Sequence, residues 1–534
     1  MDSASGPDRS WRYRWAALLL IAFVAALRLI YLAWYCPLDL APDEAHYWEW
    51  SRRLDWCYYS KGPLVAWLIR LSCELCGDTM FAVRLPAVGC GSLLLAGLYT
   101  LTVQVYQSDK LAFGVVALSL TLPIIAAGSS LMTIDAPFTC AWMWALVFGH
   151  HAFFRTAGWA WPVAGLCLAV GVLAKHTMVL WVPSFALFLL TTPGGRHVLR
   201  GAGFWLMTAI GSLGGVPLLV WNASNGWVTL KHTQSHAGFE ESGGIRWLGP
   251  MQYMGTQVAV LLGIWFVVWA RAMWSHRPTR ATQPALGFLW WMSAPTFVFF
   301  GLFALKNGGG GANWPLAAYL SGMVLAAGSF SRALNSPVAW ERRLARTGAC
   351  IAACLGLLVT AVVHEPIHAQ LVLLQIAGPA SERHPMPIRR VDPTSRLRGW
   401  RYLAEEVDRV RADMDLRGVD AQLATERWTQ ASELGFYCVG HPRVFCLGVL
   451  CGDRDSQFDL RRPNPIRDPA GFQNRTFILV GTDVELLRHA FTALEPVKTI
   501  TYRENGHPTA EWQITIAHGY QGGKHFRKIG TDPQ

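Results

Sequence analysis

The chain has 534 residues, of which 52% are hydrophobic and only 15% are charged, and it contains 26 tryptophans. This composition excludes an ordinary soluble protein and indicates a polytopic membrane protein. The net charge of +11 does not indicate a nucleic-acid-binding protein, because Lys and Arg are spread between apolar segments and form no single patch.

Apolar runs long enough to cross a membrane recur through the first two thirds of the chain. A helix needs about 20 apolar residues to span the hydrocarbon. The first run follows Arg9, Arg12 and Arg14 and is too long for a signal peptide, so an uncleaved first span is predicted. The fifth and sixth runs are separated only by Lys175 and His176, and they form either one bent helix or a hairpin. The eleven predicted spans are 15–35, 86–106, 111–130, 136–154, 159–174, 177–191, 203–221, 250–270, 285–304, 314–331 and 347–363.

The distribution of Lys and Arg predicts the orientation in the membrane. Loops rich in these residues are retained in the cytoplasm, and they alternate with cation-poor loops if the N-terminus is inside. An odd number of spans then places everything after residue 364 outside. The first outer loop, 36–85, breaks this pattern, since it holds Arg52, Arg53, Lys61, Arg70 and Arg84. Either these cations bind an anion such as a phosphate headgroup, or a loop of this length simply tolerates them.

The same loop carries motifs of a known family. The segments PDEAHYWEW, YYSKGPLVAWL and FAVRLPAV resemble the lipid-linked-sugar glycosyltransferases of the protein O-mannosyltransferase type, which include the aminoarabinose transferases acting on lipid A. LMTIDAPF, WNASNGWVTLKHTQSH and GANWPLAAYL are further matches. The resemblance implies a GT-C fold, a polyprenyl-phosphate sugar donor and an active site on the outer face of the membrane.

Two acidic positions are candidates for the chemistry. Transfer from a polyprenyl-phosphate sugar requires a base for the acceptor proton and cations for the leaving phosphate. The resemblance assigns the base to Asp43, with Glu44 as a neighbour that substitutes for it or orients it, and gives Asp135 a supporting role. The alternative is structural: Asp43 would cap a helix beginning at Glu44, and Asp135 would cap one beginning at Ala136.

Four cations are predicted to bind the donor phosphate. Lys61 resembles the family lysine that contacts this group. Arg84 either holds a phosphate or snorkels to the membrane interface, while Lys175 and Lys306 lie where a lipid phosphate could be reached. Ser60 stands where many relatives have a carboxylate or a histidine, so no metal is predicted to be required, with a divalent ion left open.

Several aromatic and histidine residues surround these groups. His46, Tyr47 and Tyr59 are predicted to position the substrate. The polar loop 222–249 is predicted to be a mobile lid over the lipid. It contains His232 and His236 at a spacing that permits metal binding, but no third ligand is evident.

The tail changes in character after a linker at 364–384. Residues 385–534 alternate strand-like and helix-like runs, which predicts a small extracytoplasmic α/β domain for acceptor recognition or for packing on the outer loops. Cys438, Cys446 and Cys451 offer one disulfide if that compartment is oxidising. The predicted fold class is therefore mainly α: a GT-C-type membrane bundle over 1–363, with its catalytic first outer loop at 36–85, followed by this domain.

The predicted function is that of a membrane glycosyltransferase. It would move a sugar, with inversion, from a polyprenyl-phosphate carrier to lipid A, a glycan or a protein on the outer face of a bacterial inner membrane. Its N-terminus would be cytoplasmic, and membrane lipids but no nucleic acid would be partners. The alternative is a transporter or flippase of lipid-linked sugars, which predicts inverted repeats and charges deep inside the spans.

Overall fold

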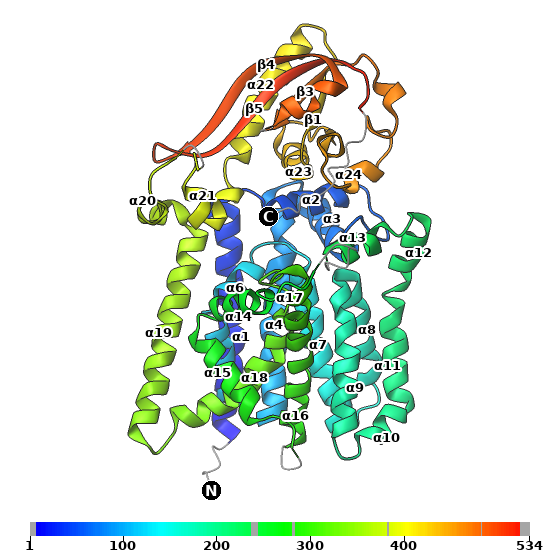
Figure 1. Cartoon of the computed structure of the whole chain (residues 1–534). Helices are drawn as coiled ribbons and strands as arrows, with labels where there is room; N and C mark the ends of the chain where they lie inside the picture. The colour runs from blue at the N-terminus through cyan, green and yellow to red at the C-terminus, as the bar shows by residue number, and fades with distance from the viewer. Residues whose placement is uncertain (1–6, 237–243, 280–282, 382–383, 482, 524–534) are drawn as a thin grey trace. The chain divides into compact units, whose positions relative to one another are not determined.

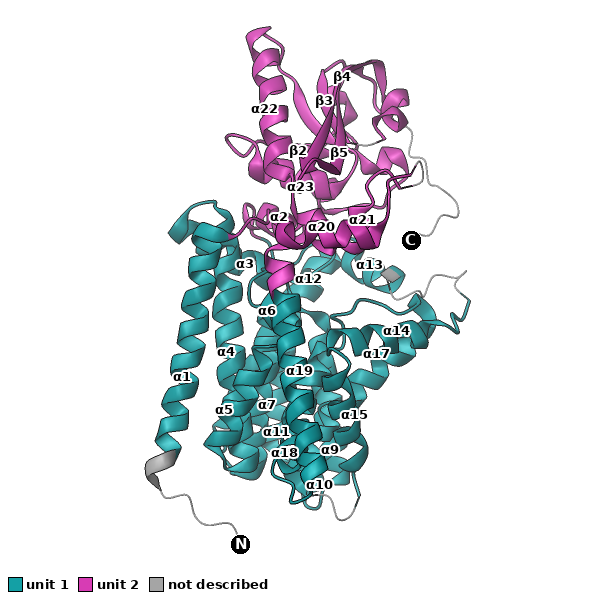
Figure 2. Ribbon diagram, turned by 90° about the vertical axis from the view of Figure 1, so that its left-hand side faces the viewer, with its two compact units in different colours: residues 1–35, 55–360 teal, residues 36–54, 361–534 magenta. Residues whose placement is uncertain are grey.

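The computed structural model describes residues 7–523 except 237–243, 280–282, 382–383 and 482 (Figure 1). The chain forms two compact units (Figure 2). Unit 1 comprises residues 1–35 and 55–360, and unit 2 comprises residues 36–54 and 361–534. The first outer loop is thus divided: its beginning, with Asp43, folds with the tail, whereas the predicted division lay after residue 363.

Unit 1 is helical throughout the part that the structure describes. Its α-helices are α1 (Pro7–Ile30), α3 (Leu64–Cys76), α4 (Met80–Tyr106), α5 (Asp109–Ser119), α6 (Pro123–Gly128), α7 (Asp135–Phe154), α8 (Ala160–Ala174), α9 (Trp181–Thr191), α10 (Gly195–Arg200), α11 (Ala202–Leu213), α12 (Val216–Ser224), α13 (Val228–His236), α14 (Gly249–Val260), α15 (Ile264–Ser275), α16 (Pro284–Trp291), α17 (Ala294–Asn307), α18 (Leu316–Leu334) and α19 (Ala339–His364), the last of which crosses into unit 2.

Eleven spans were predicted, and fewer of the described helices are by themselves long and apolar enough to cross a membrane. Among the described residues, five helical segments are long and apolar enough, and a bent pair, α14 with α15 at 113°, makes a sixth if it counts as one span. The predicted span 111–130 is divided into α5 and α6 at Pro123, because proline lacks the N–H that a continuous helix needs. The predicted pair 159–174 and 177–191 forms two short helices, α8 and α9. The five segments are Ser10–Tyr35, Met80–Tyr106, Ala202–Ser224, Pro284–Asn307 and Ala339–His364.

Helix α7 lies at the centre of unit 1. It packs against α4 and α8, and apolar residues are buried on all its sides, which is typical of a helix enclosed by others. Trp142 and Leu146 of α7 belong to the large core cluster that also contains Phe185 and Phe188 of α9. Because α7 begins at Asp135, this core fixes the position of that carboxylate.

Unit 2 is built on a mixed sheet of five strands in the order β2-β1-β3-β5-β4. β1 runs parallel to β2 and β3, while β5 is antiparallel to β3 and β4. The predicted small α/β domain is therefore confirmed. The elements are α2 (Pro42–Ser51), α20 (Pro366–Ala377), α21 (Ile388–Val391), α22 (Trp400–Leu416), β1 (Gln422–Thr425), α23 (Trp428–Tyr437), β2 (Val444–Cys446), α24 (Gln457–Leu460), β3 (Phe477–Gly481), β4 (Phe491–Glu504) and β5 (His507–Tyr520).

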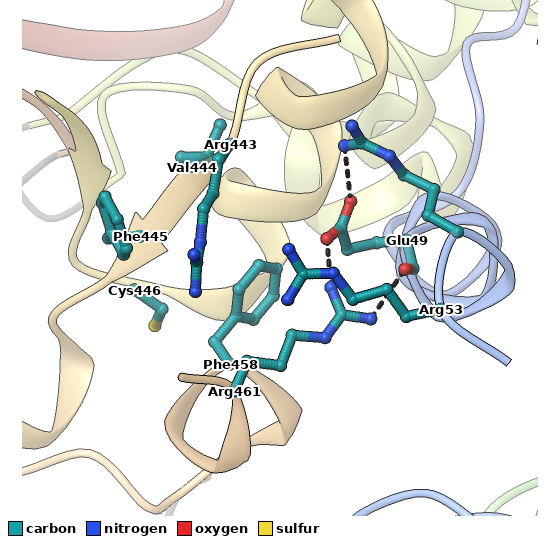
Figure 3. A pocket seen from close by; sticks show the side chains of 9 residues that line it. Glu49, Arg53, Arg443, Val444, Phe445, Cys446, Phe458 and Arg461 are labelled. Carbon is teal, nitrogen blue, oxygen red and sulfur yellow. Dashed lines mark hydrogen bonds and ion pairs between the residues drawn. The ribbon is translucent and has the colours of Figure 1, made fainter. Parts of the chain in front are cut away.

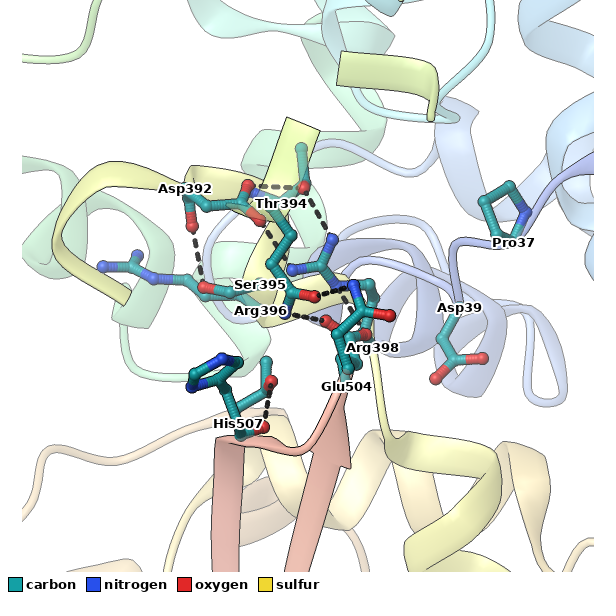
Figure 4. A network of polar contacts seen from close by, with 12 residues as sticks. Pro37, Asp39, Asp392, Thr394, Ser395, Arg396, Arg398, Glu504 and His507 are labelled. Carbon is teal, nitrogen blue, oxygen red and sulfur yellow. Dashed lines mark hydrogen bonds and ion pairs between the residues drawn. The ribbon is translucent and has the colours of Figure 1, made fainter. Parts of the chain in front are cut away.

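Most of the predicted linker 364–384 is helical, since α20 occupies Pro366–Ala377. A buried polar network connects this helix to the sheet (Figure 4). Gln370 of α20 donates a hydrogen bond to Glu504 of β4, and Glu504 lies 3.0 Å from the Arg398 guanidinium, which also pairs with Asp392 at 2.6 Å. Burying these charges is tolerated because each faces an opposite charge.

A second set of polar contacts attaches residues 36–54 to the tail within unit 2. Asp39 accepts hydrogen bonds from the backbone N–H of Trp400 at 2.8 Å and from the Arg401 guanidinium at 2.5 Å. The Tyr437 hydroxyl accepts a hydrogen bond from the backbone N–H of Leu40 at 2.7 Å. These contacts explain why the start of the first outer loop folds with residues more than 350 positions away.

Candidate active site

Asp43 lies in the first turn of α2, and its side chain is exposed. The helix begins at Pro42 and its N-cap residue is Ala41, so the alternative that Asp43 caps a helix starting at Glu44 is wrong. Proline favours the first helical position, where no N–H is needed, and this moves the helix start two residues earlier. A carboxylate in this turn is stabilised by the positive end of the helix dipole.

Glu44 has a structural partner instead. Its Oε2 accepts a hydrogen bond of 2.8 Å from the backbone N–H of Ala41, as in a capping box, and its side chain is buried. This contact holds the turn that presents Asp43. Glu44 therefore fits the role of orienting Asp43. To replace Asp43 as the base, it would have to break its hydrogen bond to the backbone N–H of Ala41.

His46 and Tyr47, the next two predicted site residues, are both buried. The Nδ1 atom of His46 lies 2.9 Å from the Ser432 hydroxyl, and its Nε2 accepts a hydrogen bond of 3.2 Å from the Trp50 indole. Tyr47 packs on Trp50 at a ring distance of 5.0 Å. Both ring nitrogens of His46 thus have partners inside unit 2, and contact with substrate stays a prediction for both residues.

Burial, followed by the positive charges of Arg461 and Arg454, lowers the pKa of His46 well below 6.5. The unfolded chain takes up this proton near pH 6.5 and the folded chain does not, so unit 2 loses stability as the pH falls below 6.5. Asp459 opposes this loss, because burial raises its pKa to about 6.

We therefore expect His46→Gln to abolish part of the acid sensitivity of the fold. The thermal unfolding midpoint of the wild-type chain in detergent should decrease more between pH 7.5 and pH 5.5 than that of the variant. The largest possible contribution of one such proton is about 1.4 kcal/mol per pH unit. Equal decreases in the two proteins would contradict this assignment.

Asp135 is the centre of a polar cluster in unit 1. Its Oδ1 pairs with the Lys175 ammonium at 2.8 Å, and its Oδ2 accepts a hydrogen bond of 2.5 Å from the Asn313 amide. The side chains of Asp135 and Lys175 are each only 12% exposed. Helix α7 begins at Asp135 with Ile134 as its N-cap, so the alternative that Asp135 caps the helix is wrong.

The Asp135 cluster borders a small, mainly apolar cavity of about 60 Å³. Leu94 and Leu98 of α4 and Leu320 of α18 are among its lining residues. Burying a carboxylate beside apolar walls is costly unless it is paired, and Lys175 is the partner of Asp135. The predicted partner of Lys175 was the lipid phosphate, so the structure adds a protein partner that the sequence did not suggest.

Asn313 is a candidate that the sequence analysis missed. It follows the four glycines of KNGGGGANWP, of which Gly308, Gly309 and Gly310 have positive φ angles of 77°, 117° and 66°. A side chain at Gly310 would also collide with the Trp314 ring. The glycines therefore let the backbone turn tightly ahead of Asn313, and a polar amide after such a turn, inside the matching segment GANWPLAAYL, was the available signal.

The remaining predicted donor-binding cations are dispersed. Lys61 is half-buried in the loop before α3, its backbone carbonyl accepts a hydrogen bond from the N–H of Tyr58, and its positive charge acts on His176. Lys306 is half-buried in the last turn of α17. Arg84 of α4 is only 1% exposed, so the alternative that it snorkels to the interface is wrong, because its side chain points inward.

Tyr59 packs on the buried ring of His232 at 5.1 Å, which connects the loop after residue 55 to α13. Residues 237–243 of the predicted lid lie outside the described residues.

Among the described residues, no three side chains of the metal-binding types gather in one place. The expectation that no metal is required stays a prediction.

The structure therefore brings Asp135, Lys175 and Asn313 together in unit 1 and places Lys61 close to His176. Four other predicted site residues belong to unit 2: Asp43, Glu44, His46 and Tyr47. Cys438, Cys446 and Cys451 are free thiols, so the disulfide offered by the sequence is not formed.

Comparisons with known proteins confirm the resemblance seen in the motifs. Residues 60–221 match the family model described as dolichyl-phosphate-mannose-protein mannosyltransferase. Lipid A galacturonosyltransferase RgtD of Rhizobium johnstonii is 29% identical over 296 residues, which are 54% of this chain and 60% of RgtD. The undecaprenyl phosphate-alpha-4-amino-4-deoxy-L-arabinose arabinosyl transferase of Pseudomonas savastanoi is 28% identical over 32% of this chain and 35% of its own. Each match spans less than two thirds of the relative.

The fold is that of ArnT, which is the GT-C type of fold that the sequence predicted. One solved structure with this fold is ArnT from Cupriavidus metallidurans, in the crystal structure bound to undecaprenyl phosphate. That comparison covers 93% of this chain and 97% of ArnT with a TM-score of 0.60 and 16% sequence identity. The apo form of ArnT gives a TM-score of 0.59 over the same shares.

Proposed function

We propose that the chain is an integral membrane glycosyltransferase that moves a sugar from a polyprenyl-phosphate carrier to a lipid A-type acceptor. The reaction would take place on the outer face of a bacterial cytoplasmic membrane. The observation that carries the proposal is the ArnT-like fold, which extends over nearly all of the chain and includes the acidic and lysine motifs.

The names of the relatives support both substrates. RgtD is a lipid A galacturonosyltransferase, and the name of the arabinosyl transferases gives an undecaprenyl-phosphate sugar. A sugar on such a carrier already has a phosphate as its leaving group. The enzyme then needs a base for the acceptor and cations for the departing phosphate.

In the proposed mechanism, Asp43 takes the proton from the acceptor hydroxyl or amine. The acceptor atom forms a bond to the anomeric carbon from the side opposite the carrier, while the bond from that carbon to the phosphate oxygen breaks. The electron pair remains on the phosphate, where Lys61 and nearby cations stabilise the charge. A single displacement inverts the anomeric centre and requires no covalent enzyme intermediate.

The proposal is tested with the purified full chain in proteoliposomes, a labelled polyprenyl-phosphate sugar and lipid A as acceptor. We expect label to appear on lipid A together with free carrier phosphate, in equal amounts. The product is identified by mass spectrometry. Movement of label across the membrane without cleavage of the carrier bond would instead indicate the transporter alternative.

Replacement of Lys61 tests the donor side of the mechanism. We expect Lys61→Ala to raise the KM for the donor about tenfold or more, because a hydrogen bond to a charged group contributes about 1.5–3 kcal/mol. The measurement is the initial rate as a function of donor concentration at saturating acceptor. Lys110→Ala, at an exposed lysine in the first turn of α5, is the matched control and should leave this KM unchanged. An unaltered donor KM in Lys61→Ala would remove Lys61 from the phosphate site.

A further inference from the structure

Unit 2 contains a cavity of about 150 Å³ that the proposed mechanism does not use (Figure 3). This volume is several times what one water molecule requires. Four arginines from three separate places in the sequence line the cavity: Arg52 and Arg53 directly after α2, Arg443 directly before β2, and Arg461 directly after α24. The one carboxylate among the lining residues is Glu49.

Glu49 is shared between two of these arginines. Arg461 forms an ion pair with its carboxylate and donates a hydrogen bond of 2.7 Å to its backbone carbonyl. Arg52 pairs with the other carboxylate oxygen at 3.1 Å and donates to the His441 carbonyl at 2.9 Å. Four positive charges and one negative charge leave an excess of +3 among the lining residues.

Asp459 and Asp453, whose charges both act on the lining residue Cys446, are nearby acids that could reduce this excess. The Asp459 carboxylate accepts hydrogen bonds from the backbone N–H and the hydroxyl of Ser456, which are its own capping contacts in α24. Even when Asp459 and Asp453 are counted, the four arginines outnumber the three carboxylates. The guanidinium groups converge on one cavity from separate elements although like charges repel, and this convergence indicates a role in binding an anion.

Arg443 shows how these charges are held. It donates a hydrogen bond of 2.6 Å to the Pro463 carbonyl, and its guanidinium lies over the Phe445 ring at 5.0 Å. Burial, together with the charges of Arg53 and Arg461, lowers the pKa of Arg443, and Glu49 offsets this only in part. The stacked ring and the carbonyl fix the direction of the guanidinium, and Figure 3 shows Arg443 and Arg53 reaching toward the same space from different elements.

We propose that this arginine cavity binds a phosphate monoester. The planar guanidinium donates paired hydrogen bonds that match phosphate oxygens, and several such groups converge here from rigid elements. A phosphate dianion would neutralise most of the excess charge. The site goes beyond the proposed function, because the proposed mechanism gives no role to its lining residues and its occupation requires no sugar transfer. The phosphate is either that of a lipid headgroup or a free phosphate.

The test is binding to the full chain without any sugar donor. Inorganic phosphate and pyrophosphate are titrated by calorimetry, and retention is measured on vesicles containing lipid A or dephosphorylated lipid A. We expect Arg443→Gln and Arg53→Gln each to weaken binding about tenfold or more, since each removes one charged partner. Arg443→Lys should retain the charge but lose the paired geometry, and it should have intermediate affinity. Arg417→Gln, at an exposed arginine paired with Asp413 in α22, is the matched control and should bind as the wild type does.

The comparison of probes identifies the source of the phosphate. Retention on lipid A vesicles that requires both the lipid phosphate and Arg443 would assign the site to a headgroup. Saturable binding of inorganic phosphate or pyrophosphate that is lost in the variants, with no preference for phosphorylated vesicles, would assign it to a free phosphate. Equal affinities of the wild type, Arg443→Gln and Arg53→Gln for every probe would overturn the proposal, whatever the transferase assay shows.

Discussion

Asp43→Asn is expected to lower the rate of sugar transfer by about 100-fold or more, since a positioned general base contributes about 10²–10⁴-fold. The substitution preserves the size of the side chain and removes only its ability to accept a proton. Asp43 is exposed in the first turn of α2, so the loss of its favourable interaction with the helix dipole should cost at most about 1 kcal/mol of stability. The substitution should therefore lower kcat and leave the thermal unfolding midpoint nearly unchanged.

The measurement is the initial rate of transfer from labelled donor to lipid A, with the thermal unfolding midpoint determined in parallel. Asp413→Asn, at a half-exposed aspartate of α22, makes the same chemical change in unit 2 and should retain wild-type activity. If Asp43→Asn also transferred sugar at the wild-type rate, the base would have to be another group. Glu44 would then be the first to be replaced, since it lies in the same turn.

The sequence predicted the class of fold well because that class depends on local composition. Apolar runs and tail strands are properties of neighbouring residues, and both appear in the structure. The number of spans was less predictable, since a proline such as Pro123 or a bend such as that between α14 and α15 divides a run without making it less apolar. The helix start at Pro42 was not predicted for a similar reason. Asp43 is itself a favourable N-cap residue, and only the backbone conformation decides which residue is the N-cap.

The candidate site was predictable as a set of residues but not as a set of contacts. The family motifs identified Asp135 and Lys175, which are 40 positions apart, yet nothing in the sequence indicated that they pair with each other. Asn313 is 178 positions from Asp135, and its amide is brought there by the turn of glycines. Contacts of this kind depend on how whole helices pack, which periodicity does not specify.

The cations of the first outer loop show the same limit. Under the predicted orientation, their excess indicated either an anion site or a loop that tolerates cations, and Arg52 and Arg53 line a cationic cavity. Arg461 and Arg443 lie about 400 positions further along the chain and could not be associated with them from the sequence. Arg70 was grouped with them by proximity alone, and in the structure it pairs with Glu74 one helical turn away.

Asp135→Asn should destabilise unit 1 by about 3–5 kcal/mol, because removing one member of a buried ion pair leaves the other without compensation. The Lys175 side chain, only 12% exposed and beside the Phe138 ring, would lose its partner at 2.8 Å. Asn313 would also lose the charged acceptor of its amide hydrogen bond. The measurement is the thermal unfolding midpoint of the purified chain in detergent.

The double variant Asp135→Asn/Lys175→Met distinguishes a structural pair from a functional one. Replacing both charges should restore most of the stability, since a well-packed apolar pair is often as stable as a buried ion pair. If the pair also positions the substrates, transfer should stay at least about tenfold below the wild type while the unfolding midpoint returns, because the geometry of the reacting groups contributes to the rate. Recovery of both the transfer rate and the unfolding midpoint would show that the pair only holds α7 and α8 in place. A double variant as unstable as Asp135→Asn would show that the ion pair is not what stabilises this part of unit 1.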